Sequence, residues 1–157
     1  MYKLELDSFY NDFSLIGISA TIEGFKIAYL INKKMGFNFS KCRNDVMMKV
    51  KNNSLAFEIF KFHNQKTRST LYLVQNKSTY TLQTTSVSNA LFDVDQTLHK
   101  YLINSHKQAE YLIKIEDDYN HMNTKAMVSS LNEIPQLVSA FEIPFEDIKS
   151  PENLIFE

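Results

Sequence analysis

Glycine, proline, cysteine and tryptophan are all scarce in this chain of 157 residues, which contains three, three, one and none of them. A loop that cradles phosphate needs several clustered glycines, because its backbone amides must approach the anion closely. The glycines stand singly, at positions 17, 24 and 36. This spacing excludes P-loops and dinucleotide-binding loops, and the low glycine and proline content excludes collagen-like and low-complexity chains.

Cysteine and histidine give no sign of a metal centre. The single cysteine, Cys42, cannot form a disulfide within the chain, and its isolation is typical of a reducing compartment. The four histidines, at positions 63, 99, 106 and 121, are not paired at the spacing that zinc ligands require. We therefore predict neither a metal site nor a cofactor, and we interpret Cys42 as an ordinary structural cysteine.

A long hydrophobic run is also absent. The longest apolar stretch, residues 13–22, falls short of the roughly 20 residues that span a membrane. Charged residues interrupt the start of the chain at positions 3, 5, 7 and 12, a pattern unlike that of a secretory signal. The sequence thus predicts a cytoplasmic protein that makes no contact with a membrane.

What the chain does contain is enough apolar material for a folded core. Hydrophobic residues make up 44% of the sequence and aromatic residues 13%. This excludes a disordered chain, because such chains cannot bury enough apolar surface to offset their ordering entropy. A length of 157 residues is typical of one domain, so we expect residues 1–157 to fold as a single domain.

The charges are unevenly distributed, although the net charge is only −1. Residues 26–68 carry ten basic side chains against two acidic ones, whereas residues 110–157 carry ten acidic side chains against three basic ones. One interpretation is that the basic part binds an anionic partner. We favour a second interpretation, in which the two parts neutralise each other or share a solvated surface, because no run of consecutive basic residues exceeds two.

Hydrophobic periodicity predicts strands and a helix in the first third of the chain. Residues 2–6 and 12–20 read as strands. The segment from Glu23 to Met35 has its apolar residues at helical spacing, and Gly36 follows as a stop signal. This segment therefore predicts the first main helix.

The middle of the chain predicts a hairpin. Residues 55–62 and 70–75 are rich in aromatic and β-branched residues, and they flank a polar loop. A further strand is expected over 79–83, after a turn at 76–78. The stretch 84–96 is rich in Ser, Thr and Asn and predicts a loop.

The last third predicts a strand–helix–strand unit. Residues 110–115 and 137–143 read as strands, and the helix between them is capped by Asn123 or Thr124 and ended by Pro135. Such a unit is a βαβ or split-βαβ motif. The fold class we predict is α+β, with a mainly antiparallel sheet, two main helices on one face, and a C-terminal unit that resembles half of a ferredoxin-like fold.

Residues 101–117, YLINSHKQAEYLIKIED, resemble the signature of the IPExxxVDY family of uncharacterised bacterial proteins. Ile103 and Tyr111 match the first and last signature positions, and Glu110 is a conservative change. Asn104 and Ser105 stand where the family has Pro-Glu. Residues 12–36 and 148–157 also look like the family. The resemblance implies no catalytic activity, because none is assigned to the family.

Three hypotheses for function remain after these exclusions. Nothing in the motifs predicts an enzyme, so by elimination we favour a binding or adaptor protein that acts through protein contacts. The first alternative is an RNA-binding accessory protein that uses the basic region 26–68, with Lys61, Lys66 and Arg68 as candidate contacts near aromatic rings.

The aromatic residues nearest to Lys61, Lys66 and Arg68 are Phe60, Phe62 and Tyr72, and we expect Phe60 and Phe62 to lie in the core.

The second alternative is an ACT-like domain that senses a small molecule beside the loop after residue 115. The protein partner, the oligomeric state and any ligand are not predicted by the sequence.

Overall fold

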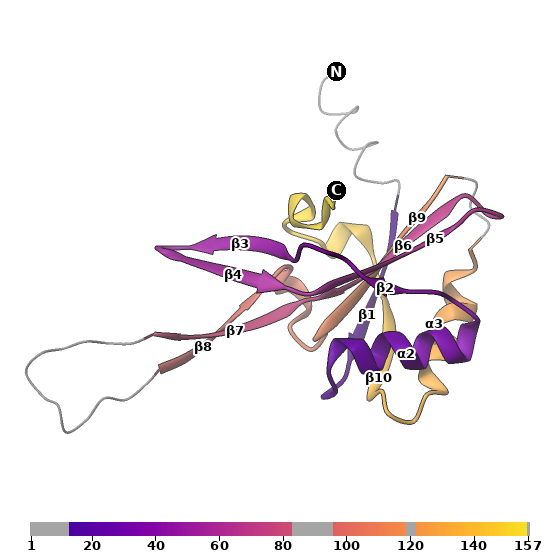
Figure 1. The fold of residues 1–157 in the computed structure, drawn as a ribbon, viewed down its shortest axis with the longest axis horizontal. Helices are drawn as coiled ribbons and strands as arrows, with labels where there is room; N and C mark the ends of the chain where they lie inside the picture. Colours follow the sequence, from indigo (N-terminus) through magenta and orange to yellow (C-terminus); the bar gives the residue numbers. More distant parts are fainter. Residues whose placement is uncertain (1–12, 83–95, 119–121, 157) are drawn as a thin grey trace, which may run out of the picture.

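The computed structural model of this chain describes residues 13–82, 96–118 and 122–156. Its centre is a six-stranded antiparallel sheet with the strand order β10-β1-β9-β6-β5-β2 (Figure 1). The six strands are β1 (Phe13–Ser19), β2 (Ser40–Lys41), β5 (Ile59–Asn64), β6 (Ser69–Gln75), β9 (Tyr111–Asp117) and β10 (Ser139–Ile143). The predicted α+β class with a mainly antiparallel sheet is confirmed.

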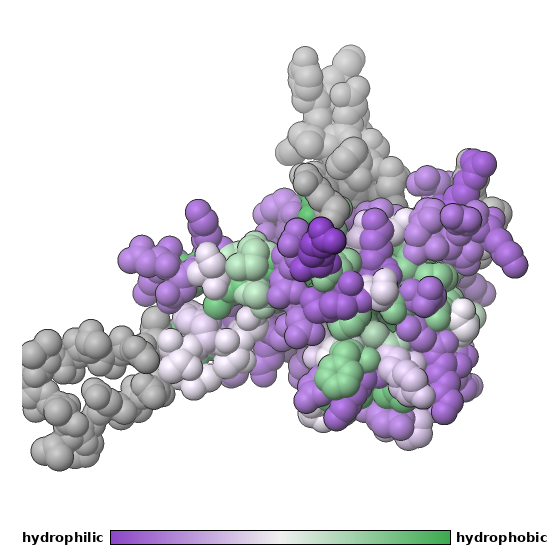
Figure 2. Space-filling model, viewed as in Figure 1, coloured by the Kyte–Doolittle hydropathy of each residue, from purple (hydrophilic) through white to green (hydrophobic). Residues whose placement is uncertain are grey.

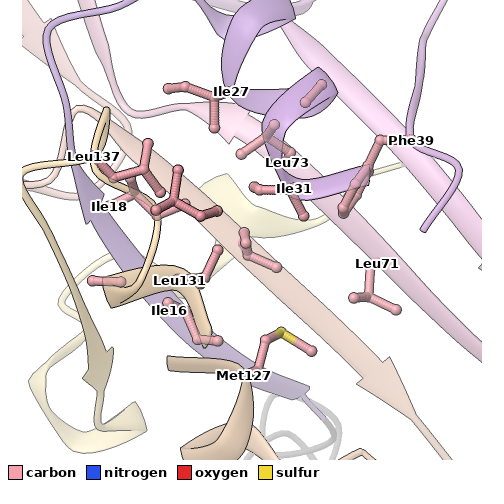
Figure 3. Packing of buried hydrophobic residues seen from close by; sticks show 14 of the residues in the cluster. Ile16, Ile18, Ile27, Ile31, Phe39, Leu71, Leu73, Met127, Leu131 and Leu137 are labelled. Atoms are coloured by element: carbon pink, nitrogen blue, oxygen red, sulfur yellow. The ribbon is translucent and has the colours of Figure 1, made fainter. Parts of the chain in front are cut away.

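Both main helices lie on one face of this sheet. Helix α2 (Gly24–Met35) follows β1, and α3 (Thr124–Asn132) joins β9 to β10. Their buried side chains pack on residues of β1, β6 and β9, as Figure 3 shows for Ile27 and Ile31 of α2 and for Met127 and Leu131 of α3. The helices thus bury their apolar stripes against the sheet, as the sequence predicts.

The residues that begin and end the helices follow the sequence prediction closely. Gly36 ends α2 in the left-handed conformation at φ 68°, and its N–H donates to Asn32 O at 2.9 Å. Asn123 caps α3, because its side-chain oxygen accepts from the N–H of Ala126 at 3.1 Å. The predicted end of α3 at Pro135 is too late, because the helix ends at Asn132.

The opposite face of the sheet is covered by segments outside the two main helices. These are residues 102–110, with the short 3-10 helix η1 (Asn104–His106), and the C-terminal segment with η2 (Phe145–Asp147) and η3 (Pro151–Leu154). Because both faces are covered, β9 is buried over four consecutive residues, from Leu112 to Ile115, and does not alternate between buried and exposed positions.

Two ribbons of two strands extend from the sheet toward the same side of the molecule (Figure 1). One pairs β3 (Val46–Val50) with β4 (Asn53–Phe57), and the other pairs β7 (Lys77–Leu82) with β8 (Gln96–Tyr101). The ribbons meet near their bases, where the Ser78 hydroxyl donates to Ala56 O at 3.1 Å.

The predicted strand over residues 55–62 is wrong in its extent. The chain passes from β4 to β5 at Glu58, so residues 55–57 belong to a ribbon and only residues 59–64 form the hairpin with β6. The switch occurs because Leu55 and Phe57 pair with β3, a partner that local propensity does not reveal.

The strand expected over 79–83 is also placed differently. It forms as β7, which begins directly after Asn76 and pairs with β8 in a separate ribbon. The strand predicted over 2–6 and the predicted loop, except its last residue Gln96, lie outside the described residues.

The strand–helix–strand unit is present as β9, α3 and β10. Each of these two strands pairs antiparallel with β1, one on either side. They therefore run parallel to each other with β1 between them, which is the split form of the predicted unit. The likeness to half of a ferredoxin-like fold stays a prediction.

Candidate functional site

The segment that resembles the family signature folds around one buried side chain, that of Asn76. Its Oδ1 accepts from the N–H of Ile103 at 2.9 Å, and its Nδ2 donates to Ala109 O at 2.8 Å. The Asn76 N–H donates to Glu110 O at 2.7 Å, and Asn76 O accepts from the N–H of Leu102 at 2.9 Å. Asn76 thus joins the β6–β7 junction to both ends of residues 102–110.

Glu110 and Tyr111, the last two signature positions, hold the connection between β1 and α2. Glu110 Oε2 accepts from the N–H of Ala20 at 3.0 Å, and the Tyr111 hydroxyl donates to Ile22 O at 3.2 Å. Burial raises the pKa of Tyr111 above its ordinary value, and nearby carboxylates, Glu58 first, raise it further. Tyr111 therefore stays a neutral hydrogen-bond donor at neutral pH.

Asn104 and Ser105, which stand where the resemblance would place Pro-Glu, lie nearer the surface than Ile103. Ile103 is buried, whereas Asn104 is exposed in η1. Ser105 is half-buried, and its hydroxyl contacts His106 Nδ1 at 3.1 Å. The matching positions thus contact backbone and core of the same chain. The contacts of Glu110 and Tyr111 are structural, because they hold the β1–α2 connection.

An open pocket of about 290 Å³ lies beside these residues. Its lining is polar and includes Glu110 and Tyr111 together with Thr21, Gln75, Lys77 and Thr79. One carboxylate oxygen of Glu110 and the Tyr111 hydroxyl already bind backbone groups. The loop where the small-molecule hypothesis places its ligand is partly outside the described residues, which omit 119–121, so that hypothesis stays a prediction.

The three candidate RNA contacts, Lys61, Lys66 and Arg68, lie on the hairpin of β5 and β6, which also carries Phe60 and Phe62. Phe60 is buried in the core under the helices, and Phe62 packs against the same core, as predicted. Lys61 lies between them in sequence and turns to the other face, where its Nζ is 5.7 Å from the centre of the Tyr72 ring.

Lys66 and Arg68 lie in the turn of this hairpin, next to acidic residues. Ser69 pairs with Asp117 and Thr70 pairs with Glu116 across β6 and β9, so the turn adjoins the acidic end of β9. The neighbouring Tyr72 ring is 6% exposed and packs against Phe156. It therefore offers no free face on which a base could stack, and the RNA-binding role of these residues stays a prediction.

An ion pair joins the basic part of the chain to the acidic part, and another lies within the basic part. Lys34 of α2 contacts Glu133 after α3, with Nζ and Oε2 at 2.7 Å. Lys41 contacts Asp45 at 2.5 Å. These contacts accord with the interpretation in which the two parts share a solvated surface.

Metal-ligating residues do not gather within the described ranges: no three His, Cys, Asp or Glu side chains there lie close enough together to hold an ion. Cys42 is half-buried, and its N–H donates to Ile59 O at 2.9 Å, as a structural residue of the β2 edge would. In the same ranges, no helix has the length and apolar character needed to cross a membrane.

The surface feature that sequence reasoning missed is a pair of exposed aromatic residues on α2. Phe25 is 58% exposed and Tyr29 is 63% exposed. They are four residues apart, so they lie one above the other on the outward side of the helix, and we call them the α2 aromatic patch. Figure 2 shows hydrophobic residues at the surface where α2 lies in Figure 1. The signal in the sequence was the break in amphipathicity, because both residues fall outside the buried stripe of Ile27, Ala28 and Ile31.

Comparison of this chain with models of protein families, with curated proteins and with solved structures finds no match. The resemblance to the IPExxxVDY family stays a prediction.

Proposed function

We propose that this chain is a non-enzymatic, cytoplasmic protein-binding module that contacts its partner through the α2 aromatic patch. The observation that supports this most directly is the exposure of Phe25 and Tyr29, each more than half accessible to solvent on a helix whose other face is fully packed. Aromatic side chains are enriched at protein interfaces relative to the rest of the surface, and they supply much of the binding energy there.

The size of the patch suits the centre of an interface. If a fully exposed aromatic side chain presents roughly 200 Å², the two rings together leave on the order of 240 Å² open. A standard interface buries about 800 Å² on each partner. The patch would therefore anchor a contact whose polar rim comes from the neighbouring residues of the helix.

The charges around the patch indicate the chemistry of the partner. Lys26 and Lys33 lie on the outward side of α2. The Nζ of Lys26 lies 3.8 Å from Glu23 Oε2 and 5.9 Å from the centre of the Phe25 ring. An apolar surface with basic neighbours is complementary to a partner surface that presents apolar side chains flanked by acidic ones. We therefore expect the partner to be a protein with an acidic, apolar-centred surface.

Photo-crosslinking followed by affinity measurement tests this proposal. A photo-reactive residue is placed at position 29 and, as a matched control, at position 138, where Val138 is 70% exposed. We expect a discrete crosslinked protein from position 29 alone. The purified partner should then bind the double variant Phe25→Ser, Tyr29→Ser about tenfold or more weakly than wild type, and bind Val138→Ser with unchanged affinity.

Loss of folding would not explain such a result, because substitution of exposed side chains changes stability by only about ±0.5 kcal/mol. Equal crosslinking from both positions, or equal affinity of the double variant and wild type, would contradict the proposal.

A further inference from the structure

The two edges of the central sheet are protected against pairing with other chains. At the β10 edge, the Asn132 side chain accepts from the N–H of Ala140 at 2.8 Å and donates to Ala140 O at 2.9 Å. Pro144, which has no N–H, follows this strand directly. At the other edge, the outermost strand β2 is only two residues long. Short, capped edges are how proteins avoid unwanted strand addition.

Strand β3 lacks this protection. It is five residues long, and among the described residues it pairs with β4 alone. Every second residue of an edge strand turns its N–H and C=O groups away from its partner. No proline interrupts residues 46–50, and among the residues that the structure describes no strand lies on the outer side of β3.

A further strand would increase the stability of the two-stranded β3–β4 ribbon more than that of the central sheet. A ribbon of two strands is only marginally stable, and a third strand over an apolar face adds stability. Val46, Met48 and Val50 are half-buried on the face that continues the core, and Met47, 60% exposed, lies on the other face. Figure 2 shows hydrophobic residues along this ribbon and hydrophilic ones at its tip.

The side chains of β3 specify what an added strand must present. A strand beside β3 continues both of its faces, since side chains alternate with a period of two. On the first face, apolar residues would extend the row of Val46, Met48 and Val50. On the second face the exposed Lys49 is basic, and Arg43 and Lys51 lie close by in sequence. The complementary residues on that face are acidic.

We propose that β3 binds an extended segment of another protein as an added strand, and that this segment alternates apolar and acidic residues. Addition of a strand to an exposed edge is an established mode of peptide recognition, in which backbone hydrogen bonds supply affinity and alternate side chains supply specificity. This site is separate from the α2 aromatic patch, and neither proposal depends on the other.

A synthetic peptide tests the proposal. The probe has seven residues, with valine at odd and glutamate at even positions, and carries a solubilising tag. We expect its titration into the ¹⁵N-labelled full chain to shift the amide signals of residues 46–50 and to slow their hydrogen exchange. The control peptide has the same side chains but N-methyl groups on alternate residues, which removes the donors of one edge; it should not bind.

A charge exchange tests the specificity. Lys49→Glu keeps the ribbon backbone, and we expect it to bind the glutamate peptide about tenfold more weakly, while a peptide with lysine in place of glutamate gains affinity for it. The double variant Phe25→Ser, Tyr29→Ser should bind the glutamate peptide as wild type does, which separates this test from that of the α2 aromatic patch.

Three results of the peptide experiments would overturn the proposal. They are equal binding of the N-methylated peptide, shifts that map away from β3, and absence of binding up to about 1 mM peptide, an affinity of only about −4 kcal/mol. Self-association of the chain that is abolished by Lys49→Glu would also overturn it, because it would make a second copy the occupant of the edge.

Discussion

Among the described residues, the side chains of Asn32, Asn76 and Asn132 each accept from a backbone N–H and also donate to a backbone C=O. Asn32 accepts from the N–H of Phe39 and donates to its carbonyl, at 2.8 and 3.1 Å. Asn132 does the same with Ala140, and Asn76 binds Ile103 and Ala109. An amide side chain carries one donor and one acceptor group, so it can satisfy a backbone segment as a strand would. In a chain with few glycines and prolines, these contacts fix connections that tight turns fix elsewhere.

Asn76 is the most consequential of the three, because it is fully buried. We expect Asn76→Ala to lower the free energy of unfolding by about 3 kcal/mol or more, since the N–H of Ile103 and the carbonyl of Ala109 lose their partners in a buried site. Urea denaturation followed by circular dichroism measures this. Asn53→Ala, at an exposed asparagine, is the control and should change stability by no more than about 0.5 kcal/mol. A similar, small effect of both substitutions would contradict the role of Asn76.

At the scale of elements, burial decides which segments are regular and which extend from the core. Helix α2 is fixed by its apolar stripe and by Gly36 at its end, and β1 and β9 are fixed by burial on both faces. The β3–β4 and β7–β8 ribbons have weaker support, because each is a sheet of two strands among the described residues and extends from the central sheet (Figure 1). The surfaces that we assign to partners belong to these less supported or outward-facing parts.

The end of α2 provides a test at this scale. Nothing lies within 4 Å of a Cβ added at Gly36, yet its φ of 68° is unfavourable for residues with a side chain. We therefore expect Gly36→Ala to destabilise the protein by about 1 kcal/mol through backbone strain alone. Gly36→Asn should cost less, because asparagine tolerates the left-handed region. Thermal unfolding by calorimetry compares the two, and equal stability of Gly36→Ala and wild type would show that the strain is absent.

At the scale of the whole molecule, one sheet separates two apolar layers. The helices form one layer, and residues 102–110 with the C-terminal segment form the other. In the second layer, the buried Lys114 contacts Glu116 at 2.7 Å and lies 5.0 Å from the ring centre of Phe13 and 5.3 Å from that of Phe156. The buried positive charge of Lys114 is thus balanced by the Glu116 carboxylate and by the faces of the Phe13 and Phe156 rings. Both layers depend on the same strands, so we expect them to unfold together.

The contribution of the C-terminal segment can be measured at Leu154, which is fully buried beside an exposed neighbour. We expect Leu154→Ala to lower the free energy of unfolding by about 2–4 kcal/mol, through lost burial and the cavity left behind. Ile155→Ala, at a residue that is half exposed, should change it by about 0.5 kcal/mol at most. Tyrosine fluorescence and circular dichroism should give the same urea midpoint in each variant. Separate midpoints would contradict a single cooperative unit.

Local patterns in the sequence were sufficient for the elements whose stabilisation is local or strongly amphipathic. These are β1, α2 with Gly36, the presence though not the bounds of the β5–β6 hairpin, and β9, α3 and β10, with the α3 cap predicted at Asn123 or Thr124. Their apolar periodicity and end signals act within a few residues along the chain, so they can be read without knowing the neighbours. The α+β class followed from them.

Only the tertiary structure decided the features that depend on contacts between distant residues. The division of residues 55–62 at Glu58 depends on pairing with β3, and the separate ribbon of β7 depends on pairing with β8. Asn76 gains its role from residues 27 and 33 positions away in the chain. The α2 aromatic patch and the open edge of β3 are defined by what does not cover them within the described residues. Burial of a side chain or an edge is a property of the assembled fold, and a local pattern does not contain it.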